Sequence, residues 1–256
     1  MAKTLKRIYA GSIVLSSLCD RVRPKDSPKQ RAAKRQASSE AQRKMNQINS
    51  YQQLELMLAV NFPTAGSGLV TVVTFDDAHM PKNRREALDR LKYFKKLLRE
   101  ARRAAGLPDP VICSAPEVLT SESGRWHFHL VIDNTGQDYD MIRSSWIYGS
   151  DVDISPLRVD KEKNHETLAR YMTKELRECQ DYDCRPGLHS WSWTRNAKRP
   201  ETDAVVVQDD FQLDVPEDAT VLLDEQKQTA FAAWRVMKIR YACAQAPKPR
   251  ARRRRR

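Results

Sequence analysis

Residues 125–134, with the sequence RWHFHLVIDN, decide how the rest of the chain is interpreted. Because side chains alternate along a β-strand, one face of this stretch would carry His127, His129 and Val131. The opposite face would carry four apolar side chains, those of Trp126, Phe128, Leu130 and Ile132. Two imidazoles two residues apart can share one divalent cation. The alternative is an ordinary strand whose polar face carries histidine, so the flanking sequence has to decide.

The segments around this strand predict an α+β fold. Apolar and β-branched runs predict further strands at residues 69–75, 111–119 and 152–157, with a turn at 121–124 before the histidine strand. Apolar residues at helical spacing predict helices at 51–62, 83–105, 139–146 and from about 164 to 179. The order β-α-β-β-α-β with a closing helix predicts a ferredoxin-like or RRM-like antiparallel sheet with helices on one face. The two imidazoles would point from the open face.

Composition divides the chain into four regions. Residues 1–50 are expected to form a basic, flexible N-terminal arm, and 51–200 a globular domain with its core at 69–180. Residues 201–245 are expected to be a C-terminal extension, strand-like at 202–218 and helical at 219–242. Residues 246–256 are expected to be a disordered arginine-rich tail that makes sequence-independent phosphate contacts.

Charge and cysteine content restrict the class of protein. The chain has 256 residues and a formal net charge of +12, which favours a polyanionic partner such as nucleic acid. Its five cysteines are odd in number and widely spread, so reduced thiols are expected. A zinc site at Cys179, Cys184 and His189 is disfavoured, because the paired short spacings are missing. No small-x-small cleavage site follows the apolar residues 8–18, and no run is long enough to span a bilayer, so we expect a cytoplasmic protein without a membrane partner.

The closing helix carries a tyrosine and a lysine three residues apart, Tyr171 and Lys174, which therefore lie on neighbouring positions of one helix face. The apolar stripe of this helix consists of Leu168, Met172, Leu176 and Cys179. Tyr171 lies roughly 90° around the helix from that stripe, at its rim, where it could reach a bound substrate. The alternative is a half-buried packing tyrosine beside a solvated lysine.

Together these segments resemble a family. The strand at 70–75, the sequence HFH at 127–129 and the sequence YMTK at 171–174 resemble, in order and spacing, the three motifs of the HUH endonucleases, the rolling-circle replication initiators of plasmids and phages. Residues 187–200 resemble the segment that follows the catalytic helix in these proteins. The resemblance covers about residues 69–200.

The resemblance implies nicking and joining of single-stranded DNA through a 5′-phosphotyrosine. Tyr171 would be the nucleophile, and Lys174 would either favour the phenolate or stabilise phosphoryl charge. His127 and His129 would hold Mg²⁺ or Mn²⁺, of which Mn²⁺ suits imidazole ligands better. Glu175 stands where two-tyrosine members have their second nucleophile, which implies a single-tyrosine enzyme. The implied partners are single-stranded or stem-loop origin DNA and a helicase and polymerase of a bacterial host; the oligomeric state stays open.

The family implies a third metal ligand on the preceding strand. A three-residue turn at 122–124 would place Leu119 opposite His127 and Glu117 opposite His129, so that Glu117 shares the face of the histidines. Glu122 is the second candidate.

Further residues are candidates for DNA contacts: Arg125, Arg170, Trp191, Trp193, Arg195, Lys198 and Arg199. Core packing is an equal alternative for either tryptophan. The alternatives for the whole protein are a transposase or relaxase with the same chemistry, or a basic nucleic-acid-binding module without catalysis.

Overall fold

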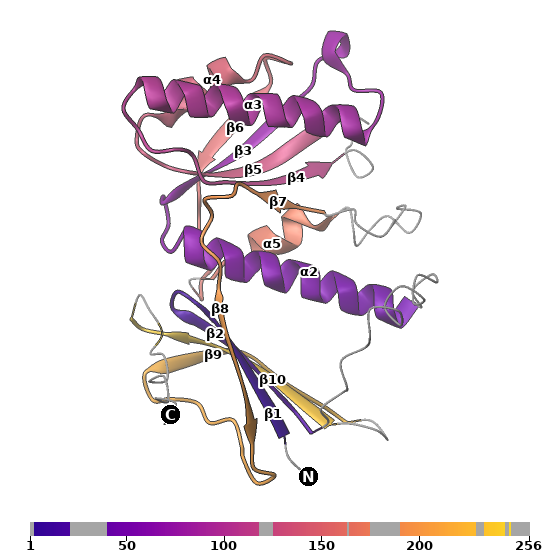
Figure 1. The fold of residues 1–256 in the computed structure, drawn as a ribbon, viewed down its shortest axis with the longest axis vertical. Helices are drawn as coiled ribbons and strands as arrows, with labels where there is room; N and C mark the ends of the chain where they lie inside the picture. Colours follow the sequence, from indigo (N-terminus) through magenta and orange to yellow (C-terminus); the bar gives the residue numbers. More distant parts are fainter. Residues whose placement is uncertain are drawn as a thin grey trace, which may run out of the picture. The chain divides into compact units, whose positions relative to one another are not determined.

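The computed structural model describes residues 3–20, 40–117, 125–162, 164–174, 190–228, 233–243 and 246. The chain divides into two compact units (Figure 1). The larger unit comprises Ala37–Lys198, and the smaller one combines Met1–Gln36 with Arg199–Arg256. Across the described ranges, no helix combines the length and the apolar character that crossing a membrane requires.

The larger unit is built on an antiparallel sheet. Its strands are β3 (Gly68–Thr74), β4 (Ile112–Glu117), β5 (His127–Asp133), β6 (Val152–Pro156) and the short β7 (Ser192–Trp193). They lie in the order β6-β3-β5-β4-β7. The first four strands therefore have the ferredoxin-like arrangement that the order of elements predicts, with β6 at one edge. The predicted α+β class and antiparallel sheet are confirmed.

Helices cover both faces of this sheet. The helices α3 (Arg84–Ala104) and α4 (Asp138–Ser145) pack on one face, and α2 (Glu40–Asn61) and α5 (Glu166–Met172) on the other (Figure 1). A short 3-10 helix, Asp77–His79, follows β3. The face that carries the imidazoles is thus covered, whereas the sequence predicted an open one. The reason is that the segment predicted as a helix at 51–62, which forms the end of α2, packs Tyr51, Leu54, Leu58 and Phe62 against this face.

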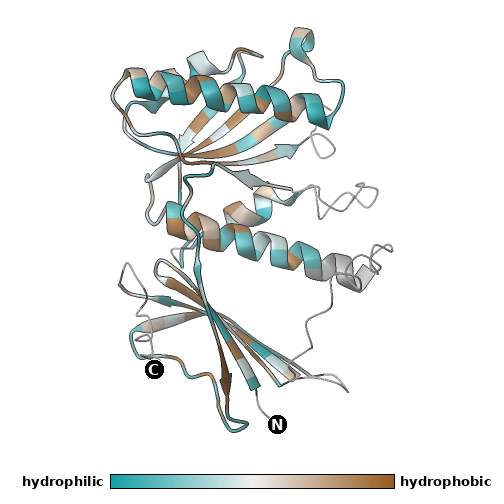
Figure 2. Ribbon diagram, viewed as in Figure 1, coloured by the Kyte–Doolittle hydropathy of each residue, from teal (hydrophilic) through white to brown (hydrophobic). Residues whose placement is uncertain are grey.

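The histidine strand divides its side chains between the two faces as alternation predicts. Phe128, Leu130 and Ile132 lie in the core beneath α3 and α4, whereas Val131 lies in the core beneath α2 and α5. In Figure 2 the ribbon of α3 changes between hydrophilic and hydrophobic colours along its length.

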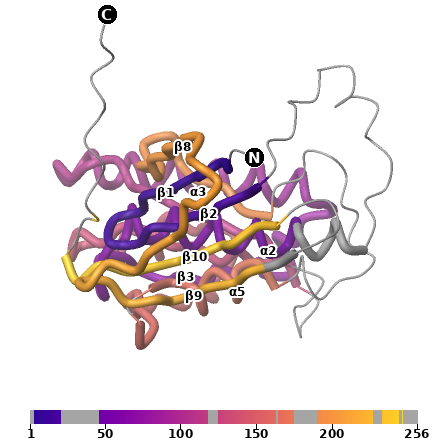
Figure 3. Tube along the Cα trace, turned by 90° about the horizontal axis from the view of Figure 1, so that it is seen from below, coloured from indigo at the N-terminus to yellow at the C-terminus, as the bar shows by residue number. Residues whose placement is uncertain are grey.

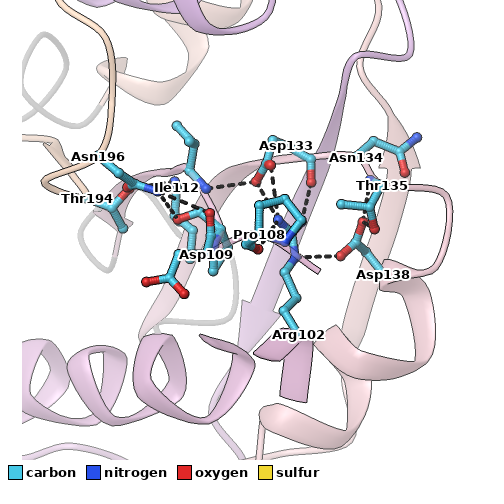
Figure 4. Close-up of polar contacts among 12 residues, drawn as sticks. Arg102, Pro108, Asp109, Ile112, Asp133, Asn134, Thr135, Asp138, Thr194 and Asn196 are labelled. Carbon is cyan, nitrogen blue, oxygen red and sulfur yellow. Dashed lines mark hydrogen bonds and ion pairs between the residues drawn. The ribbon is translucent and has the colours of Figure 1, made fainter. Parts of the chain in front are cut away.

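Helix α3 begins at a capped turn and ends in a buried ion-pair network. The side chain of Asn83 accepts a hydrogen bond from the backbone N–H of Glu86 at 3.0 Å. The guanidinium of Arg102, fully buried, donates to Asp138 Oδ1 at 2.8 Å and to both carboxylate oxygens of Asp133 at 3.0 Å (Figure 4). This network joins α3 to β5 and α4. Arg102 follows Leu98 by one helical turn and therefore lies in line with the buried side chains of α3.

The smaller unit is a second antiparallel sheet of five strands. They are β1 (Lys3–Ala10), β2 (Ile13–Cys19), β8 (Glu201–Val207), β9 (Ala219–Gln228) and β10 (Ala233–Tyr241). Their order is β8-β1-β2-β10-β9, which can be followed in Figure 3. Its core includes Leu5, Val14, Met237 and Ile239.

This second sheet corrects two predictions. Residues 3–19, predicted as part of a flexible arm, form the hairpin β1–β2 around Gly11, whose φ of 61° suits a two-residue turn. Of residues 219–242, predicted as a helix, 219–228 form β9 and 233–241 form β10. Met237, Ile239 and Tyr241 are buried at a period of two, and β10 pairs with β2 from the other end of the chain. Pairing over such a separation leaves no local signal. Of the predicted tail at 246–256, only Ala246 is among the described residues.

Candidate active site

The pairing of β4 with β5 fixes which side chains share the face of the histidines. Glu117 lies opposite His127, and Ala115 lies opposite His129. The predicted register, with Glu117 opposite His129, is therefore wrong by two residues. A shift by an even number keeps every side chain on its face, so Glu117 still points to the same side as the two imidazoles. The predicted turn at 122–124 and the second candidate, Glu122, lie outside the described residues.

Three potential metal ligands converge at this point. Glu117 Oε2 contacts His129 Nε2 and lies 3.3 Å from His127 Nε2, and the rings of the two histidines are 5.0 Å apart. One donor atom from each side chain lies within 4.8 Å of the other two. Two imidazoles and a carboxylate form a donor set that suits a divalent transition-metal ion. Glu117 and His129 are buried and His127 is partly exposed.

The protonation of the histidines fits this role. The Nδ1–H of His127 donates to the carbonyl oxygen of Arg125 at 3.2 Å, which in the neutral ring leaves the Nε2 lone pair available to bind a cation. Burial lowers the pKa of His129 from its usual value of 6.5, although the hydrogen bond to Glu117 opposes this shift. A lowered pKa favours the neutral imidazole, which is the form that binds metals. Among the described residues, His129 Nδ1 has no hydrogen-bond partner.

Tyr171, on α5, and Lys174, just after it, lie beside these ligands. The ring of Tyr171 packs against that of His129 with centroids 4.8 Å apart, and its side chain is 46% exposed. Lys174 Nζ lies 2.7 Å from Glu117 Oε1 and 4.7 Å from the centre of the Tyr171 ring. The sequence left two roles open for Lys174, and the structure adds a contact that neither included, an ion pair with the carboxylate that faces both imidazoles.

The position of α5 depends on α2. Asn164 Nδ2 donates to Glu55 Oε1 at 3.2 Å, and His165 Nε2 donates to the carbonyl oxygen of Phe62 at 2.7 Å. All three polar side chains in these contacts are buried. Sequence analysis missed them; the one available signal was Glu55, an acidic residue inside the apolar run at 54–58. A buried carboxylate needs a partner, and Asn164 supplies one at the start of α5.

Two of the predicted DNA contacts are arginines with partners inside the protein. Arg125 forms an ion pair with Asp77 at 2.8 Å. Arg170 donates to the hydroxyl of Tyr51 at 2.8 Å and pairs with Glu166 at 2.7 Å. Both guanidinium groups thus hold protein elements together.

The two tryptophans are packed against α2, which supports the packing alternative. Trp191 Nε1 donates to Ser50 Oγ at 3.1 Å, and the Trp193 ring stacks on Phe62 with centroids 5.9 Å apart.

The remaining predicted residues are distributed over both units. Arg195 and Lys198 are exposed on the larger unit, and Arg199 belongs to the smaller one. Glu175 and the disfavoured zinc candidates Cys179, Cys184 and His189 lie outside the described residues.

Comparison with known proteins gives one weak structural match. No family model matches the chain, and no curated protein matches its sequence. A solved structure of the N-terminal nuclease domain of non-structural protein 1 from minute virus of mice matches with a TM-score of 0.21 and 11% identity, over 79% of this chain and 72% of that chain. That domain is described as coordinating Zn²⁺ in its active-site pocket and recognising DNA at the origin of replication. At this level of similarity, function has to be inferred from the side chains of the present chain.

Proposed function

We propose that this chain is a metal-dependent DNA endonuclease and strand transferase of the HUH type. The observation that carries the proposal is the exposed ring of Tyr171 packed against His129, within the group formed by Glu117, His127 and Lys174. A nucleophile, a set of metal ligands and a cation thereby meet at one end of β5.

The reaction is a transesterification at phosphorus. The hydroxyl oxygen of Tyr171 attacks a phosphodiester of single-stranded DNA and gives up its proton, and the bond to the 3′ oxygen breaks. The 3′ oxygen takes up a proton, and the 5′ phosphate remains on the tyrosine. Because one ester replaces another, the reverse step can rejoin DNA ends. A divalent cation held by Glu117, His127 and His129 would neutralise charge on the phosphoryl oxygens.

The ligands fit Mn²⁺ or Mg²⁺ chemistry, with Mn²⁺ the better match for two imidazoles. Lys174 acts in this arrangement through Glu117. Its ammonium engages Oε1, which leaves Oε2 turned toward the two imidazoles. Lys174 is therefore proposed as the residue that orients the acidic ligand, in addition to its place beside the Tyr171 ring.

The proposed biological role is initiation of rolling-circle replication at single-stranded or stem-loop origin DNA, with a helicase and polymerase supplied by the host. Of the predicted DNA contacts in the larger unit, Arg195 and Lys198 are best placed for phosphates, because both are exposed. A transposase or relaxase would use the same site. A binding module without catalysis is disfavoured, because α2 and α5 cover the sheet face on which bases would stack.

The test is formation of a covalent protein–DNA adduct. The full chain is incubated with Mn²⁺ and a library of single-stranded and stem-loop DNAs, and adducts are separated by denaturing electrophoresis. DNA labelled at its 3′ end should remain on the protein, and DNA labelled at its 5′ end should be released as a shorter strand. Tyr171→Phe should abolish the adduct, whereas Tyr139→Phe, at an exposed tyrosine on α4, should leave it intact. An adduct that survives Tyr171→Phe, or no adduct with the unmodified chain, contradicts the proposal.

A further inference from the structure

A groove lies along the larger unit where α3 passes the edge strand β7. Its volume is about 800 Å³, and it is lined on one side by α3 and on the other by residues 193–196. Five basic side chains line it: Lys92, Lys95, Lys96, Arg99 and Arg195. The acidic residues on its wall are Asp89 and Asp109. Asp109 already forms an ion pair with Arg103 at 2.7 Å, so the groove is strongly positive.

The wall opposite α3 is fixed in place by hydrogen bonds. Thr194 Oγ1 accepts from the backbone N–H of Ile112 at 3.0 Å (Figure 4). Asn196 Nδ2 donates to the carbonyl oxygen of Asp109 at 3.1 Å and lies 3.3 Å from that of Pro110. Trp193, which also lines the groove, stacks on Phe62. These contacts tie the wall to the sheet, so a ligand would meet a groove that is already formed.

One ammonium group of the groove is held among uncharged partners. Lys95 Nζ donates to Ser114 Oγ at 2.8 Å, and Ser114 Oγ lies 2.9 Å from Ser192 Oγ. Burial lowers the pKa of Lys95 to about 8, so the side chain still carries a charge near neutral pH. A desolvated cation without a carboxylate partner gains more from a bound anion than a solvated one does.

The other basic residues are available at the surface. Within the described part of the chain, Lys92, Arg99 and Arg195 form no ion pair, and Lys96 has only Glu100, at 3.8 Å. Tyr93 stands among them with 43% of its side chain exposed. A basic groove with an exposed aromatic side chain suits single-stranded nucleic acid, since the cations can follow the phosphates and the ring can stack on a base.

We propose that this groove is a second DNA-binding site, which holds the backbone of a single strand away from the metal ligands. The histidines lie on the face of the sheet that α2 and α5 cover, whereas α3 packs on the opposite face. A strand in the groove is therefore not the segment that Tyr171 would cleave. This inference rests on the proposed function in one respect: it takes DNA as the polyanion that the groove binds.

The experiment measures binding without cleavage. The full chain carrying Tyr171→Phe is titrated into a fluorescently labelled single strand of mixed sequence, and anisotropy is followed at several salt concentrations. The groove variant reverses three charges, Lys92→Glu, Lys96→Glu and Arg99→Glu. The control variant reverses three exposed charges of the same unit outside the groove, Lys82→Glu, Arg85→Glu and Arg143→Glu. Thermal unfolding confirms that both variants are folded.

The groove variant should bind the single strand about tenfold more weakly or worse. The slope of log K against the logarithm of the salt concentration should fall in magnitude by about 2, because each lost phosphate contact of a single strand lowers it by about 0.7. The control should bind within about twofold of the parent, since it leaves the local field of the groove unchanged. Equal losses in the two variants, or no loss in either, would overturn the proposal. So would a duplex of the same sequence that competes better than the single strand. Because no cleavage is measured, failure of adduct formation would count against the proposed function alone.

Discussion

Glu117 is the residue on which the candidate site depends, because its two oxygens serve two different purposes. One faces the imidazoles and the other meets the ammonium of Lys174. The sequence could place Glu117 on the correct face but not in the correct register, since the register depends on the loop before β5 and an error of two residues leaves the face unchanged. The contact with Lys174 could not be predicted, because it joins a strand end to a helix end across the fold.

The first prediction concerns the imidazole of His127. His127→Ala should abolish nicking and weaken Mn²⁺ binding at least tenfold, because it removes one of three converging ligands. Isothermal titration calorimetry with Mn²⁺ and the adduct assay measure the two effects. His79→Ala removes an imidazole whose side chain is 44% exposed and paired with Asp76, so it should change neither. Salt-sensitive DNA binding should persist in both variants; unchanged Mn²⁺ affinity in His127→Ala would refute this assignment.

The second prediction follows from the lowered pKa of Lys95. The unfolded chain keeps this lysine protonated up to about 10.5, whereas the folded protein releases the proton near pH 8. The unfolded state therefore binds more protons between these values, and stability should rise with pH across that window. Lys95→Met should remove this rise and increase the free energy of unfolding at pH 7 by about 1 to 3 kcal/mol. Urea titrations at pH 7, 8, 9 and 10 provide the measurement; an unchanged pH profile in the variant would show that another group is responsible.

At the scale of elements, the local sequence pattern was sufficient to predict a helix or strand wherever that element has its own apolar face. Strands β3, β5 and β6 and helices α3, α4 and α5 follow from such patterns. The pattern failed at the end of α3, where Arg102 takes a place in the buried stripe. A charged residue can occupy such a place only when acidic residues from other elements surround it, and the sequence of the helix does not reveal them.

The third prediction tests that network. Arg102→Met should destabilise the protein by about 3 to 5 kcal/mol, because it leaves Asp138 buried and Asp133 without its guanidinium partner. Arg103→Met, the next residue, breaks only the exposed pair with Asp109 and should destabilise the protein far less, because solvent screens that pair. Chemical denaturation of both variants gives the comparison. Equal effects would mean that the buried network contributes no more than the surface pair.

At the scale of the whole molecule, the order of the main strands in the larger unit could be predicted from the sequence, whereas the sheet of the smaller unit could not. The β-α-β-β-α-β order of the larger unit implies its sheet order, because connections in this fold are short and local. In the smaller sheet, such short, local connections do not link all of the paired strands. Its strand β1 lies between β2, its neighbour in sequence, and β8, nearly two hundred residues away. The spacing of Trp234 and Met237 also suits a helix, and only the pairing with β2 decides for a strand.

This arrangement has a consequence for synthesis of the protein on the ribosome. The β1–β2 hairpin leaves the exit tunnel before the larger unit, yet both of its outer edges are completed by β8 and β10, which are translated after that unit. At a translation rate of about 5 to 20 residues per second, roughly 10 to 40 seconds pass between the synthesis of the hairpin and that of these partner strands. During that time its unpaired edges are open to association with other nascent chains, and the larger unit has to fold while they are exposed.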